Sequence, residues 1–408
     1  MLESYANVIS MLQGTAFAIS SPLKDNYVDW IYEAFDPVLQ KGGVMSMVSG
    51  RTIRMGASEG SHQLSVIEQM LRLLDAQRPK DKAKMESIIK YYVTYDTSKD
   101  YYLSLPISQI PTLVRIMEDE SITAREPREQ AKVYHKMDRV VQHRDEEGYS
   151  AGLAMSSSRV YNYESITGYN TTGWYIGDGM LYVYDDEDLT QFDNSFWQTV
   201  NPYRMPGVTA DTQERPAASI AQRNEYLSHQ DFVGGAEMEG GFATAAMALE
   251  SYHCDGSWGT STEFAYPATN TGNAPIHDSS LTAKKSWFFF DDEIVALGAD
   301  IDSYNGINVE TTVENRKSNQ TMVINADESA QRYDILSAVA SAEPEPDNNA
   351  ANSIDGDLNT GWAAEGPANV VFDLGEEKEI GYAALAFYNG IGRQTTFDLE
   401  ISSDGQTW

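Results

Sequence analysis

Two short motifs contain residue types that can bind a metal ion. His253 and Cys254 are adjacent in the segment SYHCDGSW, and residues 177–179 read GDG, as in the turn of a calcium-binding loop. Zinc needs three or four nitrogen or sulfur ligands, and the sequence has no second cluster beside this pair. A calcium loop needs oxygen ligands at alternating positions, which the residues around GDG lack. The sequence therefore predicts no metal site, no cofactor, a small buried thiol at Cys254 and a plain turn at 177–179.

Two arginines in a polar, glycine-bearing segment could bind an anion. Arg51 and Arg54 belong to SGRTIRMGASEGS, residues 49–61. A guanidinium group is well shaped for a carboxylate or a sulfate, because it can donate two parallel hydrogen bonds. Arginines in a loop are also ordinary surface charges, so their spacing alone leaves both interpretations open.

Aromatic rings are the third group of residues that could contact a ligand. The segment SSRVYNYESITGYNTTGWYIGDGMLYVY, residues 157–184, combines tyrosines and a tryptophan with glycines and small polar residues. Aromatic side chains carry a large buried area, so we expect most of these rings in strand cores and interfaces. A minority could stack on the faces of sugars.

Composition excludes several classes of partner. The chain has 408 residues, 41% of them hydrophobic, and a formal net charge of −32. Nucleic-acid binding needs a positively charged face, so DNA and RNA are excluded. No apolar run approaches the roughly 18 residues of a membrane-spanning helix, so we expect no membrane insertion. The predicted protein is a monomer of roughly two to three domains.

The elements that must position these residues differ along the chain. In residues 1–125 apolar side chains recur at helical spacing, and Gly14 can end the first of the predicted helices. In residues 126–338 runs rich in aromatic and β-branched residues are separated by turn clusters, and no helical pattern alternates with them. This order predicts an α+β protein whose second part is an antiparallel β-sandwich.

The last part of the chain has a different composition. Residues 339–353 include SAEPEPDNNAANS, which has the Pro- and Asn-rich composition of a linker. Residues 354–408 contain short strand-like runs and end at FDLEISSDGQTW. The predicted domains are therefore a helical domain (1–125), a β-sandwich (126–338), a linker (339–353) and a tail (354–408).

Five blocks in order carry a family resemblance. They are the aromatic segment 157–184, FWQTVNPYRMPGVT (196–209), FVGG (232–235), AKKSWFFFDDEIVALGADI (283–301) and VETTVENRK (309–317). Together they resemble the central β-domain of the family-8 polysaccharide lyases, which include the hyaluronate, chondroitin AC and xanthan lyases. The segment YEAFDPVLQKGGVMSMVSGRTIR (32–54) resembles the end of the α/α toroid of that family.

The resemblance covers about residues 2–335 and implies a fold. It implies an α+β multidomain chain with the C-terminal part of an α/α toroid, followed by an antiparallel β-supersandwich. The tail resembles the first half of a discoidin-like (coagulation-factor type C) carbohydrate-binding module, which would form a partial β-sandwich.

The resemblance also implies a reaction and a partner. Family enzymes cleave acidic, uronic-acid-containing polysaccharides by β-elimination, in a cleft between toroid and sandwich. The uronate carboxylate must be neutralised, a base must remove the α-proton on C5, and an acid must protonate the departing glycosidic oxygen. The family uses an Asn, a His, a Tyr and Arg residues for this chemistry.

Three residues match the catalytic pattern. Tyr5 in YANVIS corresponds to the family tyrosine, the general base and then acid. A tyrosine has an ordinary pKa near 10, so a neutral phenol needs a neighbouring cation to act as a base. Arg51 is that cation by resemblance, and Glu164 in NYES matches a glutamate that organises the site. Without the resemblance, Tyr5 reads as a core aromatic residue of the stripe Leu2, Tyr5, Ile9 and Leu12, and Glu164 reads equally as a structural carboxylate.

Substrate-binding positions depart from the family pattern. The family has a second arginine four residues after the first, where this chain has Met55, so Arg54 is a shifted candidate. Relatives often read NGEN where this chain has TGYN, so Tyr169 replaces a glutamate and Asn170 is retained. These changes are compatible with an altered substrate within the class.

The family Asn and His have no counterparts here. All six histidines follow Tyr5, and none matches the motif in which a His precedes the tyrosine by nine residues. The N-terminus also lacks the features of a secretion signal. We therefore expect a fragment of a secreted, extracellular lyase, with the signal and the first helices lost. The alternative hypothesis is a carbohydrate-binding or scaffold protein without catalytic chemistry.

Overall fold

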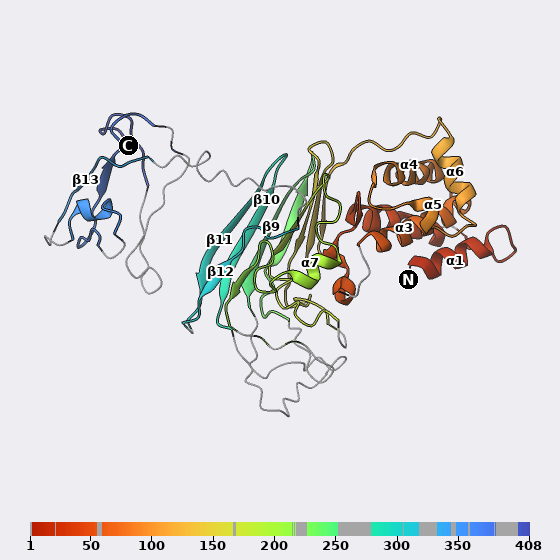
Figure 1. Cartoon of the computed structure of the whole chain (residues 1–408), viewed down its shortest axis with the longest axis horizontal. Coiled ribbons are helices and arrows are strands. Elements are labelled where there is room, and N and C mark those ends of the chain that lie inside the picture. Colours follow the sequence, from red (N-terminus) through yellow and green to blue (C-terminus); the bar gives the residue numbers. More distant parts are fainter. Residues whose placement is uncertain are drawn as a thin grey trace, which may run out of the picture. The chain divides into compact units, whose positions relative to one another are not determined.

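Helices come first in the chain and strands follow (Figure 1). The computed structural model describes residues 2–20, 22–54, 59–165, 169–213, 215, 217, 227–251, 279–304, 306–317, 333–343, 348–357, 360–378, 380 and 399–408. The chain forms two units, Met1–Gln320 and Thr321–Trp408. The first unit contains all the predicted site residues.

The structure confirms the helices that apolar periodicity predicts in residues 1–125. Its helices are α1 (Leu2–Leu12), α2 (Leu23–Trp30), α3 (Glu59–Leu73), α4 (Pro79–Tyr95), α5 (Tyr101–Ser104) and α6 (Ile110–Glu118). Gly14 has a φ of +76°, a conformation that suits the end of α1. Within the described chain, no helix combines the length and apolar character needed to cross a bilayer.

Two four-stranded antiparallel sheets form the second part. The first sheet has the order β3 (Glu129–Tyr134), β4 (Arg139–Arg144), β5 (Tyr149–Ala154) and β6 (Met180–Asp185). The second has the order β11 (Ile294–Asp302), β10 (Thr282–Phe289), β9 (Phe242–Glu250) and β8 (Val233–Met238). Smaller pairs join β1 (Leu39–Gln40) to β2 (Gly43–Val44), and β7 (Thr209–Asp211) to β12 (Val309–Thr311). A short helix, α7 (Asn194–Thr199), interrupts the strands and was not predicted.

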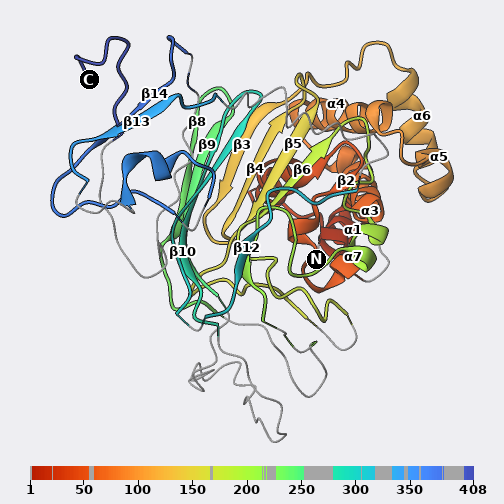
Figure 2. The same cartoon turned by 60° about the vertical axis from the view of Figure 1, so that its left-hand side comes forward.

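The first sheet is the middle layer of this unit (Figure 2). Side chains alternate between its two faces, as they must in a strand. Val141 and Tyr182 belong to the hydrophobic core shared with the helical part. Val140 and Leu153 belong to a second core, shared with β9 and β10 of the other sheet. Helices, β3–β6 and β8–β11 are therefore successive layers.

Strand β10 corrects one expectation. The aromatic run WFFF, residues 287–290, suggests from its sequence a buried strand with Trp287 and Phe289 on one face and Phe288 and Phe290 on the other. Trp287 and Phe289 are 1% and 0% exposed, but Phe288 and Phe290 are 36% and 40% exposed. The second sheet therefore buries one face against the middle layer and leaves aromatic side chains exposed on the other, within the described residues.

Most rings of the segment 157–184 are in the core, as predicted. Its five buried rings are Tyr163, Trp174, Tyr175, Tyr182 and Tyr184. The last four of these pack among themselves and against neighbouring rings with centroid separations of 5.0–6.4 Å. The two exposed rings are Tyr161 and Tyr169, at 46% and 41%.

A buried ionic cluster joins the helical part to the middle sheet. Arg128 donates from its backbone N and its Nε to the Asp145 carboxylate, at 2.9 and 3.1 Å, and the Tyr91 hydroxyl donates to the same carboxylate at 2.7 Å. Arg125 donates to both oxygens of Asp36 at 2.7 Å. Buried charges need such partners, because each isolated ion would be strongly destabilising.

His143 belongs to the same region and is neutral. Its Nε2 lies 2.7 Å from the carbonyl oxygen of Pro37, which can only accept, so Nε2 carries the proton. Its Nδ1 then accepts from the Ser150 hydroxyl at 2.9 Å. Burial, and next the nearby Arg128, lower the pKa of His143 to about 3.

This histidine should make folding stability depend on pH. The unfolded chain takes up a proton on His143 near pH 6.5, whereas the folded protein stays neutral there until about pH 3. The folded state therefore loses stability as the pH falls through this interval, by at most about 1.4 kcal/mol per pH unit. Between pH 6.5 and 5, we expect the free energy of unfolding to fall by about 2 kcal/mol less in His143→Gln than in the parent, as measured by urea unfolding. Parallel stability curves for the two proteins would contradict the assignment.

The second unit contains one described strand pair. Strand β13 (Ser337–Ala340) pairs antiparallel with β14 (Val370–Asp373). The sequence placed a domain boundary at 338 and a linker from 339. Residues 339 and 340 instead belong to a strand, because their alternating Val and Ala side chains fit a two-stranded ladder. Most of the later part of the tail lies outside the described residues.

Candidate functional site

An ion pair connects the helical part to the loop that follows β5. The Arg51 guanidinium lies 3.3 Å from the Glu164 carboxylate, measured from Nη1 to Oε1. The backbone N of Arg51 also donates to Oε2 of Glu164, at 3.2 Å. The two side chains are 50% and 52% exposed. Two residues separated by 113 positions in the chain are thus held together at a surface that a ligand can reach.

Gly50 is required at this contact. It has a φ of +54°, a conformation that L side chains rarely adopt. A Cβ atom at this position would lie 2.4 Å from Oε2 of Glu164. The glycine therefore allows the Glu164 carboxylate to approach the backbone directly before Arg51.

Asn170 is hydrogen-bonded to the backbone of Glu164. Its Nδ2 donates to the backbone oxygen of Glu164 at 2.8 Å, and the residue is only 2% exposed. Its φ of +48° is one that asparagine tolerates better than most residues. The prediction that Asn170 binds substrate remains untested, and its burial favours a role in holding the loop.

Tyr5 lies on α1 and is not a core residue. Its side chain is 49% exposed, whereas Ala6 and Ile9 of the same helix are buried. The Tyr5 ring packs against the ring of Tyr27 on α2, with centroids 5.5 Å apart. In the described residues, no hydrogen bond links its hydroxyl to Arg51 or Glu164. Hydrogen bonds between catalytic groups are often long in the absence of substrate and shorten once the substrate is bound.

Tyr169 and Arg54 are the two remaining predicted site residues. Tyr169 is 41% exposed and adjacent to Asn170, so its ring is accessible beside the Glu164 loop. Arg54 ends the short helical turn Gly50–Arg54, and its side chain lies outside the described residues. Cys254 and His253 also lie outside them.

Three cations of the first unit are paired with carboxylates, although binding a polyanion favours a positively charged surface. Besides the Arg51–Glu164 pair, Lys41 pairs with Asp186, and Lys317 donates to Asp193 at 2.9 Å. A polyanion would therefore have to compete with carboxylates of the protein for these cations. The Arg51–Glu164 pair is the most exposed of the three, which makes exchange easiest there.

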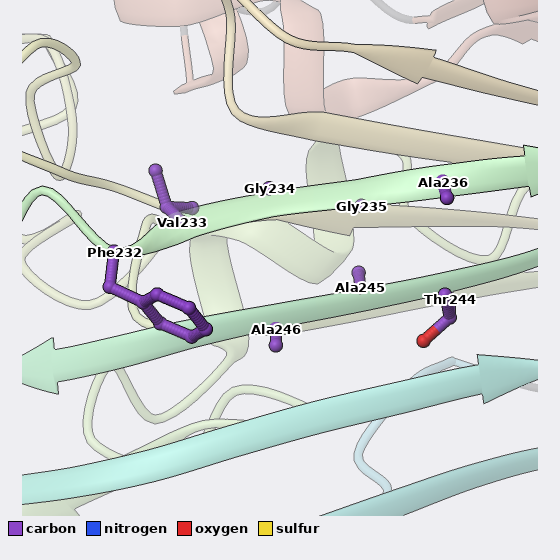
Figure 3. Close-up of a pocket in the computed structure, with 8 residues that line it drawn as sticks. All are labelled: Phe232, Val233, Gly234, Gly235, Ala236, Thr244, Ala245 and Ala246. Carbon is purple, nitrogen blue, oxygen red and sulfur yellow. The ribbon is translucent and has the colours of Figure 1, made fainter.

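A surface hollow of about 330 Å³ lies elsewhere, over strands β8 and β9 (Figure 3). Phe232 borders it at one end, and Gly234, Ala236 and Ala246 are among its small lining residues. None of the predicted site residues lines it. Within the described part of the chain, no three acidic, His or Cys side chains are grouped as ligands for a metal ion.

Comparison with protein families agrees with this layout of helices followed by stacked sheets. The polysaccharide lyase family 8 super-sandwich domain matches residues 129–378, and the N-terminal alpha-helical domain of the same family matches residues 1–91. The chain belongs to polysaccharide lyase family 8. The family thus accounts for both the helical layer and the two antiparallel sheets.

Individual family members are similar over most of this chain. A xanthan lyase from Bacillus sp. (strain GL1) is 35% identical over 320 residues, which cover 78% of this chain and 31% of that protein. A hyaluronate lyase from Staphylococcus aureus (strain NCTC 8325 / PS 47) is 33% identical over 325 residues, which cover 78% and 36%. The structure of a chondroitin AC lyase from Streptomyces coelicolor A3 in complex with chondroitin sulphate is similar with a TM-score of 0.65, at 28% identity, covering 78% of this chain and 40% of that one. This chain spans about a third of the length of the two curated relatives.

Arg139 is a residue at this site that sequence reasoning missed. It begins β4 and donates hydrogen bonds to the backbone oxygens of Met47 and Met155, in the two segments that lead to Arg51 and Glu164. An arginine at the start of a strand looks like a surface charge in the sequence, so no local signal could have singled it out.

Proposed function

We propose that this family-8 protein takes part in cleaving a uronic-acid-containing polysaccharide by β-elimination, with Tyr5 as general base and then acid. The observation that carries the proposal is the accessible Arg51–Glu164 pair, held at the boundary of the helical part and the middle sheet. The half-exposed phenol of Tyr5 in the same unit supports it.

The proposed reaction balances without a co-reactant. The Tyr5 oxygen removes the C5 proton of the uronate, the C4–O bond to the leaving sugar breaks, and a C4=C5 double bond forms. The proton taken from C5 is returned to the departing glycosidic oxygen. Arg51 stabilises negative charge that develops during proton removal, and Glu164 fixes the direction of its guanidinium.

The named relatives suggest the substrate class. They are a xanthan lyase, a hyaluronate lyase and a chondroitin AC lyase in complex with chondroitin sulphate. The uronate carboxylate of such a polymer can bind Arg51 beside Glu164, because the guanidinium has five N–H donors and its described side-chain bond to Glu164 uses one of them. Tyr169, beside the same loop, supplies a ring on which a neighbouring sugar can stack.

We further propose that groups outside this chain neutralise the substrate carboxylate. His143 is unsuited to that task, because it is buried and both ring nitrogens have partners within the fold. The chain alone should therefore turn over slowly or not at all.

The decisive experiment compares this chain with the protein expressed from its complete gene. Hyaluronan, chondroitin and xanthan are incubated with each, and the ultraviolet absorbance of unsaturated uronate is followed. We expect the absorbance to rise with the complete protein on at least one polymer and to stay near the blank with this chain alone. Robust turnover by the chain alone would overturn the proposal that groups outside this chain neutralise the carboxylate. Saturated products would overturn the proposed β-elimination.

Glu164 provides a prediction with a built-in control. Glu164→Met removes both acceptors from Arg51, whereas Glu164→Gln keeps one oxygen. We expect turnover of the complete protein to fall about tenfold or more in Glu164→Met and less in Glu164→Gln, because a loosened Arg51 no longer meets the reacting atoms. The unfolding free energy should change by less than about 1 kcal/mol, since the pair is half exposed. Equal turnover in the two variants would contradict the assigned role.

The alternative is a protein that binds carbohydrate without catalysis. The pairing of Lys41, Arg51 and Lys317 with carboxylates favours it, because none of these three cations is then unpaired to stabilise charge that develops in a reaction. Polymer binding with unchanged affinity in a Tyr5→Phe, Arg51→Ala double variant, together with no turnover by the complete protein, would favour this alternative.

A further inference from the structure

We propose that Arg139 is a positioning residue for the reaction, acting through the Arg51–Glu164 pair. This inference rests on the proposed function. Arg139 is the first residue of β4, and its guanidinium bonds to both of the segments that carry this pair.

Its hydrogen bonds show how the two segments are joined. Nε donates to the Met47 oxygen at 3.2 Å, four residues before Arg51. Nη1 donates to the Met155 oxygen at 2.6 Å, at the start of the segment that carries Glu164. Nη1 also lies 3.0 and 3.1 Å from the oxygens of Met137 and Asp138 in the turn before β4. A single planar group thus fixes both segments to one turn.

The electrostatics of Arg139 differ from those of a stabilising ion pair. In the part of the chain that the structure describes, no ion pair joins it to a carboxylate. The neighbouring carboxylate of Asp138 instead accepts from Arg159 at 3.3 Å and from Ser157 at 2.5 Å. Burial lowers the pKa of Arg139, so its charge is held at a cost. Neutral donors could satisfy the same carbonyl oxygens at a lower free-energy cost of burial. We therefore infer that the charged group is present to hold the two segments in position.

Two contacts near Ser46 hold only the Met47 segment. The Tyr184 hydroxyl accepts from the backbone N of Ser46 at 2.9 Å, and Trp197 donates to the Ser46 hydroxyl at 3.3 Å. These bonds fix the Met47 segment to β6 and α7 only. Arg139 is thus a second link between the two segments, in addition to the direct bonds between Arg51 and Glu164.

The test is a double-mutant cycle in the protein expressed from its complete gene. Arg139→Met keeps the aliphatic stem and removes the donors. We expect it to lower kcat by about 10- to 100-fold with a smaller effect on KM, because the reacting groups are displaced rather than removed. In a Glu164→Met background the same change should lower kcat by less than about twofold, since the pair it positions is already lost. Equal losses in both backgrounds would overturn the inference.

Two further variants separate positioning from folding. Arg159→Met is the matched control, because Arg159 bonds to the same turn through Asp138 but to neither Met47 nor Met155. It should leave kcat within about twofold of the parent. Arg139→Lys keeps the charge but cannot reach both carbonyls, so it should fold and still lose turnover. Full activity in Arg139→Lys would show that charge alone suffices and would overturn the proposal.

Hydrogen exchange gives a readout that does not depend on turnover. Arg139→Met should accelerate amide exchange in peptides covering both 46–53 and 155–165, and Arg159→Met should leave the first of these unchanged. If the complete protein shows no elimination but this exchange pattern appears, the proposed function fails while the joining of the two segments by Arg139 stands. Unchanged exchange in both peptides would overturn the inference itself.

Discussion

Tyr5→Phe is expected to lower the turnover of the complete protein on its uronic-acid polymer by about 10²–10⁴-fold. The substitution removes a single oxygen, which in the proposed reaction takes the C5 proton and then returns it to the leaving group. Polymer binding should change little, because the ring that packs against Tyr27 is retained. The initial rate of absorbance increase, measured across substrate concentrations, separates kcat from KM.

A second tyrosine provides the control for this prediction. Tyr102 on α5 is 44% exposed, close to the 49% of Tyr5, and has no place in the proposed reaction. Tyr102→Phe should therefore leave kcat within about twofold of the parent. An equal effect of the two substitutions, or turnover retained in Tyr5→Phe, would remove Tyr5 from the reaction.

Asp145→Ala is expected to destabilise the fold by about 3–5 kcal/mol. The Asp145 side chain is 2% exposed and accepts hydrogen bonds from Arg128 and Tyr91. Its removal leaves the Arg128 guanidinium buried without its carboxylate, between the helical part and the middle sheet. Urea unfolding followed by circular dichroism measures the loss.

Two comparisons sharpen the prediction for Asp145. Glu310→Ala breaks the exposed Arg204–Glu310 pair and should cost less than about 1 kcal/mol. Adding Arg128→Met to Asp145→Ala should recover part of the loss, because the unpaired charge is then gone. A loss below about 1 kcal/mol for Asp145→Ala would show that the cluster does not hold these layers together.

The pH dependence of the same carboxyl has a definite sign. Burial alone would raise the pKa of Asp145, but Arg128 and then His143 hold it well below its ordinary value of 3.8. Its contribution to stability is therefore present above pH 3.8 and is lost as the pH falls toward the pKa of the folded state. Acid unfolding of this protein should thus involve both His143 and Asp145.

Periodicity was sufficient to predict much of the fold. The spacing of Leu2, Tyr5, Ile9 and Leu12 predicted α1, in which Ile9 is buried as expected and Tyr5 is half exposed. The aromatic runs predicted strands β6, β10 and β11, and most rings of residues 157–184 are buried as expected. These features depend on local pattern alone.

Long-range polar contacts could not be predicted in this way. Arg128 and Asp145 appear in the sequence as ordinary charges, and only the pairing of distant segments buries them. Asn170 likewise lies in a turn-rich segment that suggests exposure, yet it is buried under Glu164. Arg51 and Glu164 were each assigned to the site by family resemblance, but their pairing was not predicted, since a contact across 113 positions leaves no periodic signal.

The central claim is that Tyr5, Arg51 and Glu164 surround the reacting uronate. A crystal structure of the complete protein carrying Tyr5→Phe, with a bound oligosaccharide of its polymer, tests this most directly. We predict that a uronate lies against the ring at position 5 with its carboxylate or C5 facing Arg51. An oligosaccharide bound only elsewhere, for example in the hollow over β8 and β9, would contradict the claim.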